Sequence, residues 1–200
     1  MKIFIVYCHP SDDSLTCHIR DSFIRGLESA GHSYVLSDLY AMNFHTDMDE
    51  AEYRREAYYR KELPIPDDVR CEQEKINACE VIVFIYPVFW SEAPAKLVGW
   101  FDRVWTFGFA YGEKRTMRQL EKALVLVSAG NTLEHFESTG IGNAMKKVML
   151  EDRLFDRVKE KEMIIFDATS RELEERKIKW DKHLQRAFDA GAGLDKQGTV

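Results

Sequence analysis

The chain has 200 residues, 45% of them hydrophobic, and its 28 basic and 34 acidic side chains give a formal net charge of −6. This size fits one α/β domain better than two, and the interspersed charges show no basic cluster that would favour nucleic acid or anionic membrane as a partner. No segment reaches the ~18 apolar residues of a membrane span and the amino terminus lacks a signal-peptide pattern, so we expect a cytoplasmic protein without membrane insertion.

Cysteine usage bears on metal binding and on the redox compartment. The four cysteines contain neither a CxxC pair nor a Cys/His cluster. A zinc site or a redox dithiol would need such spacing. The pattern therefore predicts reduced thiols and no metal site.

Five segments are typical of strands. Four nearly continuous apolar runs lack the polar alternation of a half-exposed strand, which indicates strands covered on both faces, as in parallel sheets. A fifth, weaker strand is expected between the first two of these runs. The predicted strands cover 2–7, 32–39, 81–86, 123–127 and 163–166.

Helical spacing of apolar residues occupies the intervals between these runs. The expected helices cover 15–30, 46–62, 67–80, 94–106, 138–150 and 170–189. In the last helix, Glu172/Arg176 and Glu175/Lys179 have the i,i+4 spacing of surface ion pairs. Residues 190–200 are rich in glycine and are expected to form a frayed tail.

Strands that alternate with helices predict a doubly wound parallel sheet. We expect a single α/β domain over 1–200 with the flavodoxin-like strand order 2-1-3-4-5. In that order the switch point lies between the first and third strands. The loops after Tyr7 and Tyr86 should meet there and form a ligand site.

The first of these loops, 9–16, carries the hydroxyls of Ser14 and Thr16 at the start of a helix. Free backbone amides, the helix dipole and the hydroxyls together suit a phosphate, although Ser14 could equally be an ordinary N-cap. No Gly-x-Gly-x-x-Gly motif or Walker phosphate loop follows the first strand, which argues against a Rossmann-type dinucleotide site.

The other two loops differ in character. The stretch 86–105 is rich in flat rings and poor in charge, which suits a planar aromatic ligand. In the loop 128–136, Gly130 permits close approach of the backbone to a ligand, or simply makes a turn. His135 is either an acid/base group or a surface histidine.

Several of these stretches resemble one known family in consistent order over about residues 1–150. The motif His9-Pro followed by Ser14-Leu-Thr, the stretch 38–44, and the block 87–104 followed by Phe109-Ala-Tyr111 are similar to its members. The chain resembles the flavin-dependent NAD(P)H:quinone reductases, the DT-diaphorase-like branch of the flavodoxin-like fold.

The resemblance implies a homodimer in which hydride passes from NAD(P)H through a bound flavin, FAD or FMN, to a quinone or similar planar acceptor. The substrate pocket would contain Trp90, Phe136 and, from the partner subunit, Tyr111. The flavin would be held by three loops, at His9, Ser14, Leu15, Thr16, Pro87, Val88, Phe89, Trp90, Ser128, Ala129, Gly130 and Asn131.

Two departures from the family pattern bear on the acceptor. Phe136 and Gly142 stand where the family has a Tyr and a His near the flavin pyrimidine edge, and His135 is a candidate substitute. Leu15 and Thr16 replace the usual Phe-Asn. The choices between NADH and NADPH, and among acceptors, stay open.

The sequence leaves two alternative functions. A flavodoxin-like electron carrier would have Thr-x-Thr-Gly-Asn-Thr in its first loop, which this chain lacks. A regulatory accessory subunit of a membrane transporter is known among relatives of the family, but no motif in this chain demands it.

Overall fold

The computed structural model describes residues 1–195, which form a five-stranded parallel sheet in the order β2-β1-β3-β4-β5. The predicted fold class and strand order are confirmed. The strands are β1 (Lys2–Tyr7), β2 (Ser33–Asp38), β3 (Val81–Pro87), β4 (Leu120–Ser128) and β5 (Val158–Phe166).

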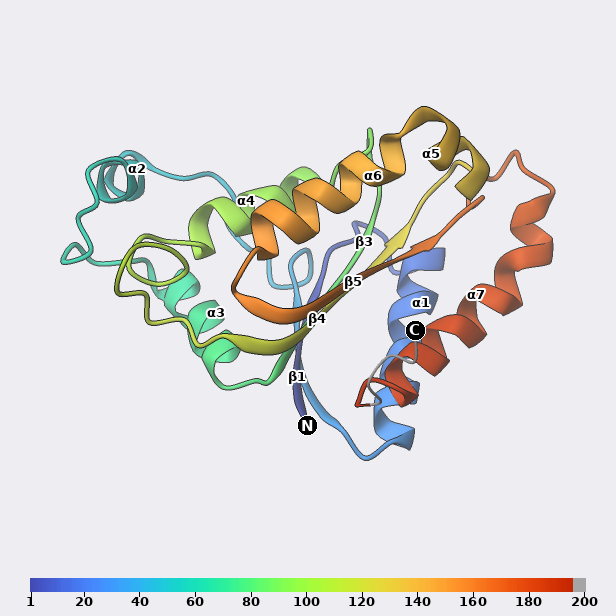
Figure 1. The fold of residues 1–200 in the computed structure, drawn as a ribbon, viewed down its shortest axis with the longest axis horizontal. Helices are drawn as coiled ribbons and strands as arrows, with labels where there is room; N and C mark the ends of the chain where they lie inside the picture. The colour runs from blue at the N-terminus through green and yellow to red at the C-terminus, as the bar shows by residue number, and fades with distance from the viewer. Residues whose placement is uncertain (196–200) are drawn as a thin grey trace.

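Helices cover both faces of the sheet (Figure 1). They are α1 (Leu15–Ser29), α2 (Glu50–Ala57), α3 (Asp67–Asn77), α4 (Ala95–Val104), α5 (Leu133–Thr139), α6 (Ile141–Lys146), the π-helix η1 (Lys147–Leu154) and α7 (Glu175–Ala192). Two apolar clusters fill the layers, one beneath α1 and α7 and the other beneath α3, α4, α6 and η1. Because both faces are covered, every residue of β3 is buried, as the apolar run predicted.

The contact between α1 and α7 depends on two glycines. A Cβ at Gly26 would lie 2.1 Å from the Phe188 carbonyl oxygen, and one at Gly191 would lie 2.3 Å from that of Phe23. The expected frayed tail from residue 190 is therefore wrong at its start, since α7 continues to Ala192 and Leu194 is buried. Residues 196–200 of that tail lie outside the described residues.

The sequence misjudged several helix boundaries. The segment expected as one helix over 138–150 is instead α5, α6 and η1, and the side chain of Thr132 caps the start of α5. The expected helix over 46–62 is shorter, because a capping box at Asp49 begins α2 and Tyr59 adopts a left-handed φ of 55° after its end. Side-chain caps and turns decided these ends, and apolar spacing does not report them.

Within residues 1–195, no helix combines the length and the apolar character needed to cross a bilayer.

Candidate functional site

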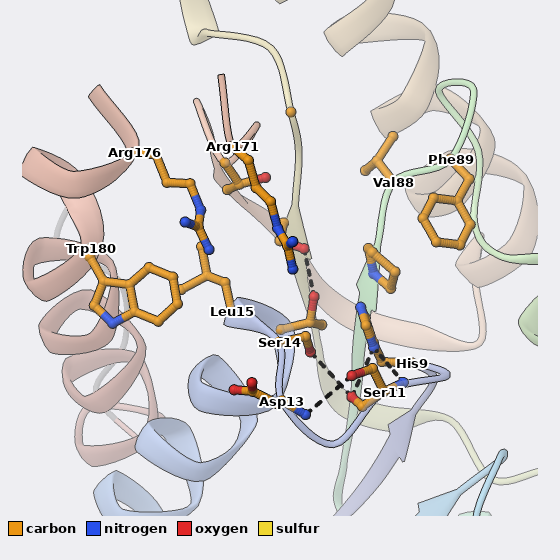
Figure 2. A pocket seen from close by; sticks show the side chains of 15 residues that line it. His9, Ser11, Asp13, Ser14, Leu15, Val88, Phe89, Arg171, Arg176 and Trp180 are labelled. Carbon is orange, nitrogen blue, oxygen red and sulfur yellow. Dashed lines mark hydrogen bonds between the residues drawn. The ribbon is translucent and has the colours of Figure 1, made fainter. Parts of the chain in front are cut away.

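A cavity of about 590 Å³ opens at the carboxyl ends of the strands, where β1 and β3 adjoin. In Figure 2 the first loop lies below the cavity, Val88 and Phe89 lie on one side, and Arg171 and Arg176 reach in from the other. The predicted switch point is therefore a real hollow. Its lining comprises His9, Ser11, Asp13, Ser14, Leu15, Thr16, Pro87, Val88, Phe89, Ser128, Gly130, Thr169, Arg171, Arg176 and Trp180.

The loop after β1 presents free backbone donors at the start of α1. The Ser14 hydroxyl caps the helix by accepting from the Cys17 amide at 3.1 Å. The amides of Leu15 and Thr16 donate to no group among the described residues. Ser14 is therefore an N-cap, and two first-turn amides stay free for an anion beside it.

His9 lies beside these donors but is occupied within its own loop. Its Nδ1 lies 2.9 Å from the Ser11 amide nitrogen and 3.0 Å from the Ser11 carbonyl oxygen. Partial burial lowers the pKa of His9, so the neutral ring is favoured near pH 7. Ser11 engages Nδ1 in either tautomer, so Nε2 is the ring nitrogen that remains for a ligand.

Two buried hydroxyls join the first and third loops beneath the cavity. Thr16 Oγ1 and Ser128 Oγ are 2.7 Å apart, and both side chains are nearly inaccessible to solvent. The Val88 amide donates to the Ser128 carbonyl at 2.8 Å, which attaches the second loop to the same point. Hydrogen bonds thus join the two loops predicted to meet at the switch point to the third loop that the resemblance assigns to the flavin.

The second loop contains a tight two-residue turn. Phe89 and Glu92 exchange both backbone hydrogen bonds, at 2.9 and 3.0 Å, across Trp90 and Ser91. Both central residues adopt left-handed φ values, 51° and 64°, which are costly for side chains other than glycine. The Glu92 carboxylate pairs with Arg153 of η1 at 2.8 Å, an ion pair that helps to hold the turn.

A fourth segment, the stretch between β5 and α7 together with the first turns of α7, completes the cavity. Its backbone follows the third loop, with Ala168 N donating to Asn131 O at 2.8 Å and Thr169 N to Ala129 O at 3.0 Å. Arg176 Nε is buried without a partner among the described residues, while its guanidinium lies 5.0 Å from the centroid of the Trp180 ring. This segment brings two guanidiniums to the cavity.

The sequence missed Thr169, Arg171, Arg176 and Trp180 as site residues. The i,i+4 spacing of Glu172 and Arg176 predicts an ion pair on one helix, but α7 begins only at Glu175, so the two residues do not share a helix. Lys179 pairs with Asp167 at 2.6 Å and not with Glu175. The sequence did contain a signal for these residues. They follow the carboxyl end of the fifth strand, and that edge of a parallel sheet holds ligands.

The cavity does not include every predicted site residue. Ala129 and Phe136 are buried in the apolar core, and His135 is exposed on α5, where it does not line the cavity. The side chain of Trp90 projects into solvent with an exposed fraction of 101%. Tyr111 lies in a separate loop after α4, where its hydroxyl binds Glu56.

The residues that line the cavity fit a planar cofactor with a phosphate. Free amides at Leu15 and Thr16, together with Arg171 and Arg176, supply donors and positive charge on one side. The Nε of Arg176, which is buried and has no partner within residues 1–195, is a donor that an anion would satisfy. Apolar side chains of the second loop form the opposite wall, against which a flat ring can pack.

Comparison with known proteins identifies the family. Residues 1–187 match the family model Flavodoxin_2, which describes a flavodoxin-like fold. The chain belongs to this family. Within the flavodoxin-like family it is similar to an NAD(P)H:quinone oxidoreductase from Methanothermobacter marburgensis, with 42% identity, a TM-score of 0.93, and coverage of 99% of this chain and 98% of the other.

Curated relatives of this flavodoxin-like chain agree with the family predicted from the motifs. Human ribosyldihydronicotinamide dehydrogenase [quinone] is 31% identical over 159 residues, which cover 70% of this chain and 68% of the relative. Rat NAD(P)H dehydrogenase [quinone] 1 is 29% identical over 166 residues, which cover 74% and 60%. The chain thus spans about two thirds of the length of such relatives. The predicted membership of the quinone reductase family is confirmed.

Proposed function

We propose that this protein is a flavin-dependent oxidoreductase that transfers a hydride from NAD(P)H to a quinone or similar planar acceptor. The observation that carries the proposal is the cavity at the switch point, with anion donors on one side and an apolar wall on the other. The relatives named as quinone oxidoreductases support it over an electron carrier or a transporter subunit.

Each side of the cavity has its own task in this proposal. The amides of Leu15 and Thr16, with Arg176, hold the phosphate end of the cofactor. Pro87, Val88 and Phe89 pack against the ring system. A bound flavin supplies the two-electron chemistry that connects NAD(P)H to the acceptor.

The third loop suits the pyrimidine edge of such a ring. The amides of Gly130 and Asn131 donate to no group among the described residues, so they are free to stabilise negative charge that develops there. His135, the candidate acid/base group, lies outside the cavity. Catalysis in this proposal therefore depends on position and on backbone donors, and we assign no side chain as a general acid.

We also propose that the protein acts as a homodimer with the site at its interface. The fully exposed indole of Trp90 and the half-exposed ring of Phe89 lie beside the cavity, where water would otherwise meet both rings. A partner subunit that brings Tyr111 to this place would cover them and supply the missing wall of the substrate pocket. Large exposed aromatic side chains are enriched in such interfaces.

The state of the cysteines supports a cytoplasmic location. All four thiols are free, and three of them are buried. Burial raises the pKa of Cys8 to about 12, so this thiol beside the site stays protonated and unreactive near pH 7. Free thiols are the rule in the reducing cytosol.

One experiment tests the proposed function. The purified protein is denatured and the released flavin is identified as FMN or FAD, and NAD(P)H oxidation is then measured with and without a quinone. We expect stoichiometric flavin and quinone-dependent oxidation. Protein that contains no flavin and takes up neither FMN nor FAD would refute the proposal. Redox titration separates it from an electron carrier, because a carrier would accumulate a one-electron reduced form.

A further inference from the structure

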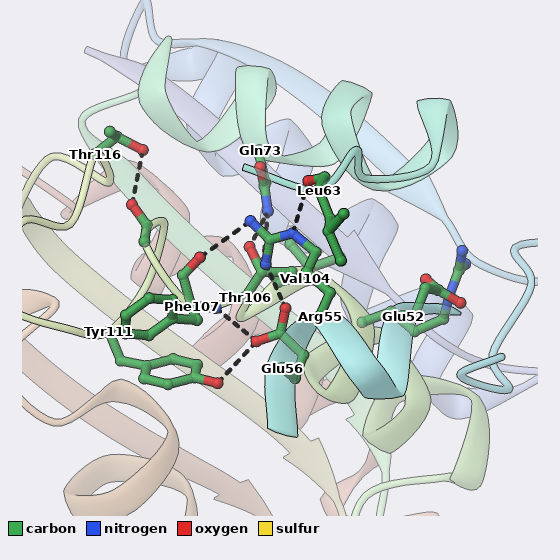
Figure 3. A network of polar contacts seen from close by, with 12 residues as sticks. Glu52, Arg55, Glu56, Leu63, Gln73, Val104, Thr106, Phe107, Tyr111 and Thr116 are labelled. Carbon is green, nitrogen blue, oxygen red and sulfur yellow. Dashed lines mark hydrogen bonds and ion pairs between the residues drawn. The ribbon is translucent and has the colours of Figure 1, made fainter. Parts of the chain in front are cut away.

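The loop after α4, residues 105–112, is attached to the molecule by buried polar side chains from α2 and α3 (Figure 3). Gln73 of α3 donates from Nε2 to the Val104 carbonyl at 3.0 Å and to Thr106 Oγ1 at 2.9 Å. These contacts fix the start of the loop. Tyr111 lies near the end of the loop, and a different side chain holds its hydroxyl.

That group is Glu56 in the last turn of α2. Its Oε2 accepts from the Tyr111 hydroxyl at 2.8 Å and from the Phe107 amide at 2.6 Å. The Glu56 side chain is only 14% exposed, so both are hydrogen bonds to a largely desolvated carboxylate. Such charge-assisted bonds are about twice as strong as neutral ones.

Arg55 compensates the charge of Glu56 and is attached to the same loop. Its guanidinium pairs with Glu56 and donates to the carbonyls of Phe107, at 3.1 Å, and Leu63, at 3.2 Å. The Arg55 side chain is only 8% exposed. An ion pair of adjacent residues buried at a surface loop therefore serves to shape that loop.

The loop itself is built to bring Tyr111 back to Phe107. Gly108 N donates to the Tyr111 carbonyl at 2.9 Å. The ring centroids of Phe107 and Tyr111 are 5.7 Å apart, in an edge-to-face arrangement. Gly112 has a φ of +97°, and a Cβ there would lie 2.7 Å from the Phe107 ring. The ring of Tyr111 has one defined direction because backbone, neighbouring ring and Glu56 all constrain it.

We propose that Glu56 is a positioning residue that fixes Tyr111 with its hydroxyl proton committed to the carboxylate, so that Tyr111 offers the electron acceptor its ring and no proton. The inference rests on the proposed function, in which Tyr111 completes the partner subunit's substrate pocket. A phenol has one proton, and here it points to Glu56.

This arrangement sets a preference among acceptors. Because the Tyr111 oxygen can only accept further hydrogen bonds, it does not select an acceptor by donating to a carbonyl. Burial and the bond to Glu56 raise the pKa of Tyr111, which keeps the phenol protonated. Selection by this residue is by the packing of flat rings.

The test compares Glu56→Ala and Glu56→Gln with a matched control, Glu50→Gln. Glu50 lies on the same helix, but its side chain is 77% exposed and its ion pair is with the exposed Arg54. Hydrogen exchange of the 105–112 peptide measures how firmly the loop is held, and this measurement needs no flavin. Steady-state kcat and KM for a quinone, together with flavin affinity, report the site.

For Glu56→Ala we expect exchange in the loop to accelerate about tenfold and the KM for quinone to rise about tenfold, the effect of losing a charge-assisted hydrogen bond. Flavin affinity and kcat should change less than twofold. Glu56→Gln retains an acceptor for Tyr111, so its loop exchange and its KM should lie between those of the wild type and of Glu56→Ala. Glu50→Gln should match the wild type in both.

Two results overturn the inference alone: unchanged exchange in Glu56→Ala, or faster exchange without a rise in KM beyond that of the control. The second would reduce Glu56 to a structural residue. A wild-type protein that binds no flavin and reduces no quinone would instead overturn the proposed function, and this inference with it.

Discussion

The cavity edge and the 105–112 loop both present groups for a ligand, but they are held in different ways. At the cavity edge, most of the ligand-facing donors are backbone groups of strand ends and of the first turn of α1, and the sheet register brings these groups together. The 105–112 loop is held by side chains of α2 and α3, which lie 31 to 55 residues away in sequence. The first kind of site follows from topology, and the second follows from individual side-chain contacts.

This contrast predicts which single substitutions lower the stability of the protein most. The largest effect should come from Arg103, which ties α4 to α2 and α3 on the side of the 105–112 loop. Its side chain is 3% exposed and pairs with Glu52 at 2.8 Å and with Asp68 at 2.5 Å. Arg103→Met should lower the free energy of unfolding by about 3 kcal/mol, because it leaves two acidic groups without their buried partner.

Urea denaturation of the Arg103 variant measures this loss. Arg54→Met is the control, since the Arg54 side chain is 64% exposed and its pair with Glu50 should contribute under about 0.5 kcal/mol. Equal free energies of unfolding for the two variants would contradict the view that buried side-chain pairs hold this side of the molecule.

Asp167 tests the cavity edge by pH. Its carboxylate accepts from the Leu133 amide at 3.0 Å and pairs with Lys179, and despite burial these partners hold its pKa below the ordinary 3.8. Because the folded pKa is lower than the unfolded one, the carboxylate stabilises the fold above the unfolded pKa and this contribution is lost as pH falls through the folded value.

Asp167→Asn should therefore cost about 2 kcal/mol at pH 7, the size of charged hydrogen bonds. The difference in Tm between wild type and variant should shrink as the pH falls below 3.8. Thermal unfolding of both proteins from pH 3 to pH 7 measures it. A constant difference would mean that the charge of Asp167 contributes nothing.

Arg176 tests whether the cavity binds an anion. Arg176→Met should weaken flavin binding about tenfold, because a charge-assisted bond to phosphate is lost from a buried donor. Lys177→Met is the matched control, since Lys177 is exposed and lies outside the cavity. Titration of flavin-free protein with FMN and with FAD measures the change, and equal affinities in the two variants would contradict the assignment.

The smallest effect is expected at Ser14, whose role as N-cap is local. Ser14→Ala should cost about 1 kcal/mol of stability, because the Cys17 amide loses its acceptor. Urea denaturation gives the value, and Ser11→Ala serves as a comparison in the same loop because Ser11 caps no helix. A loss at Ser14 no larger than that at Ser11 would show that the cap is dispensable.

Sequence by itself determined the parallel sheet, the strand order and the three loops that meet at the switch point. Apolar runs report burial on both faces, and crossover geometry then restricts the order. The motifs around His9 and Pro87 also indicated the family and hence the cofactor. These features depend on local composition and on rules that hold for all such sheets.

Tertiary structure alone decided the rest. Arg176 has the sequence spacing of a surface ion pair, and only the path of the chain before α7 brings it to the cavity. The bond from Tyr111 to Glu56 joins residues of two surface segments whose composition gives no sign of contact. Side-chain pairing across long sequence separations depends on how helices dock on the sheet, and no local pattern encodes it.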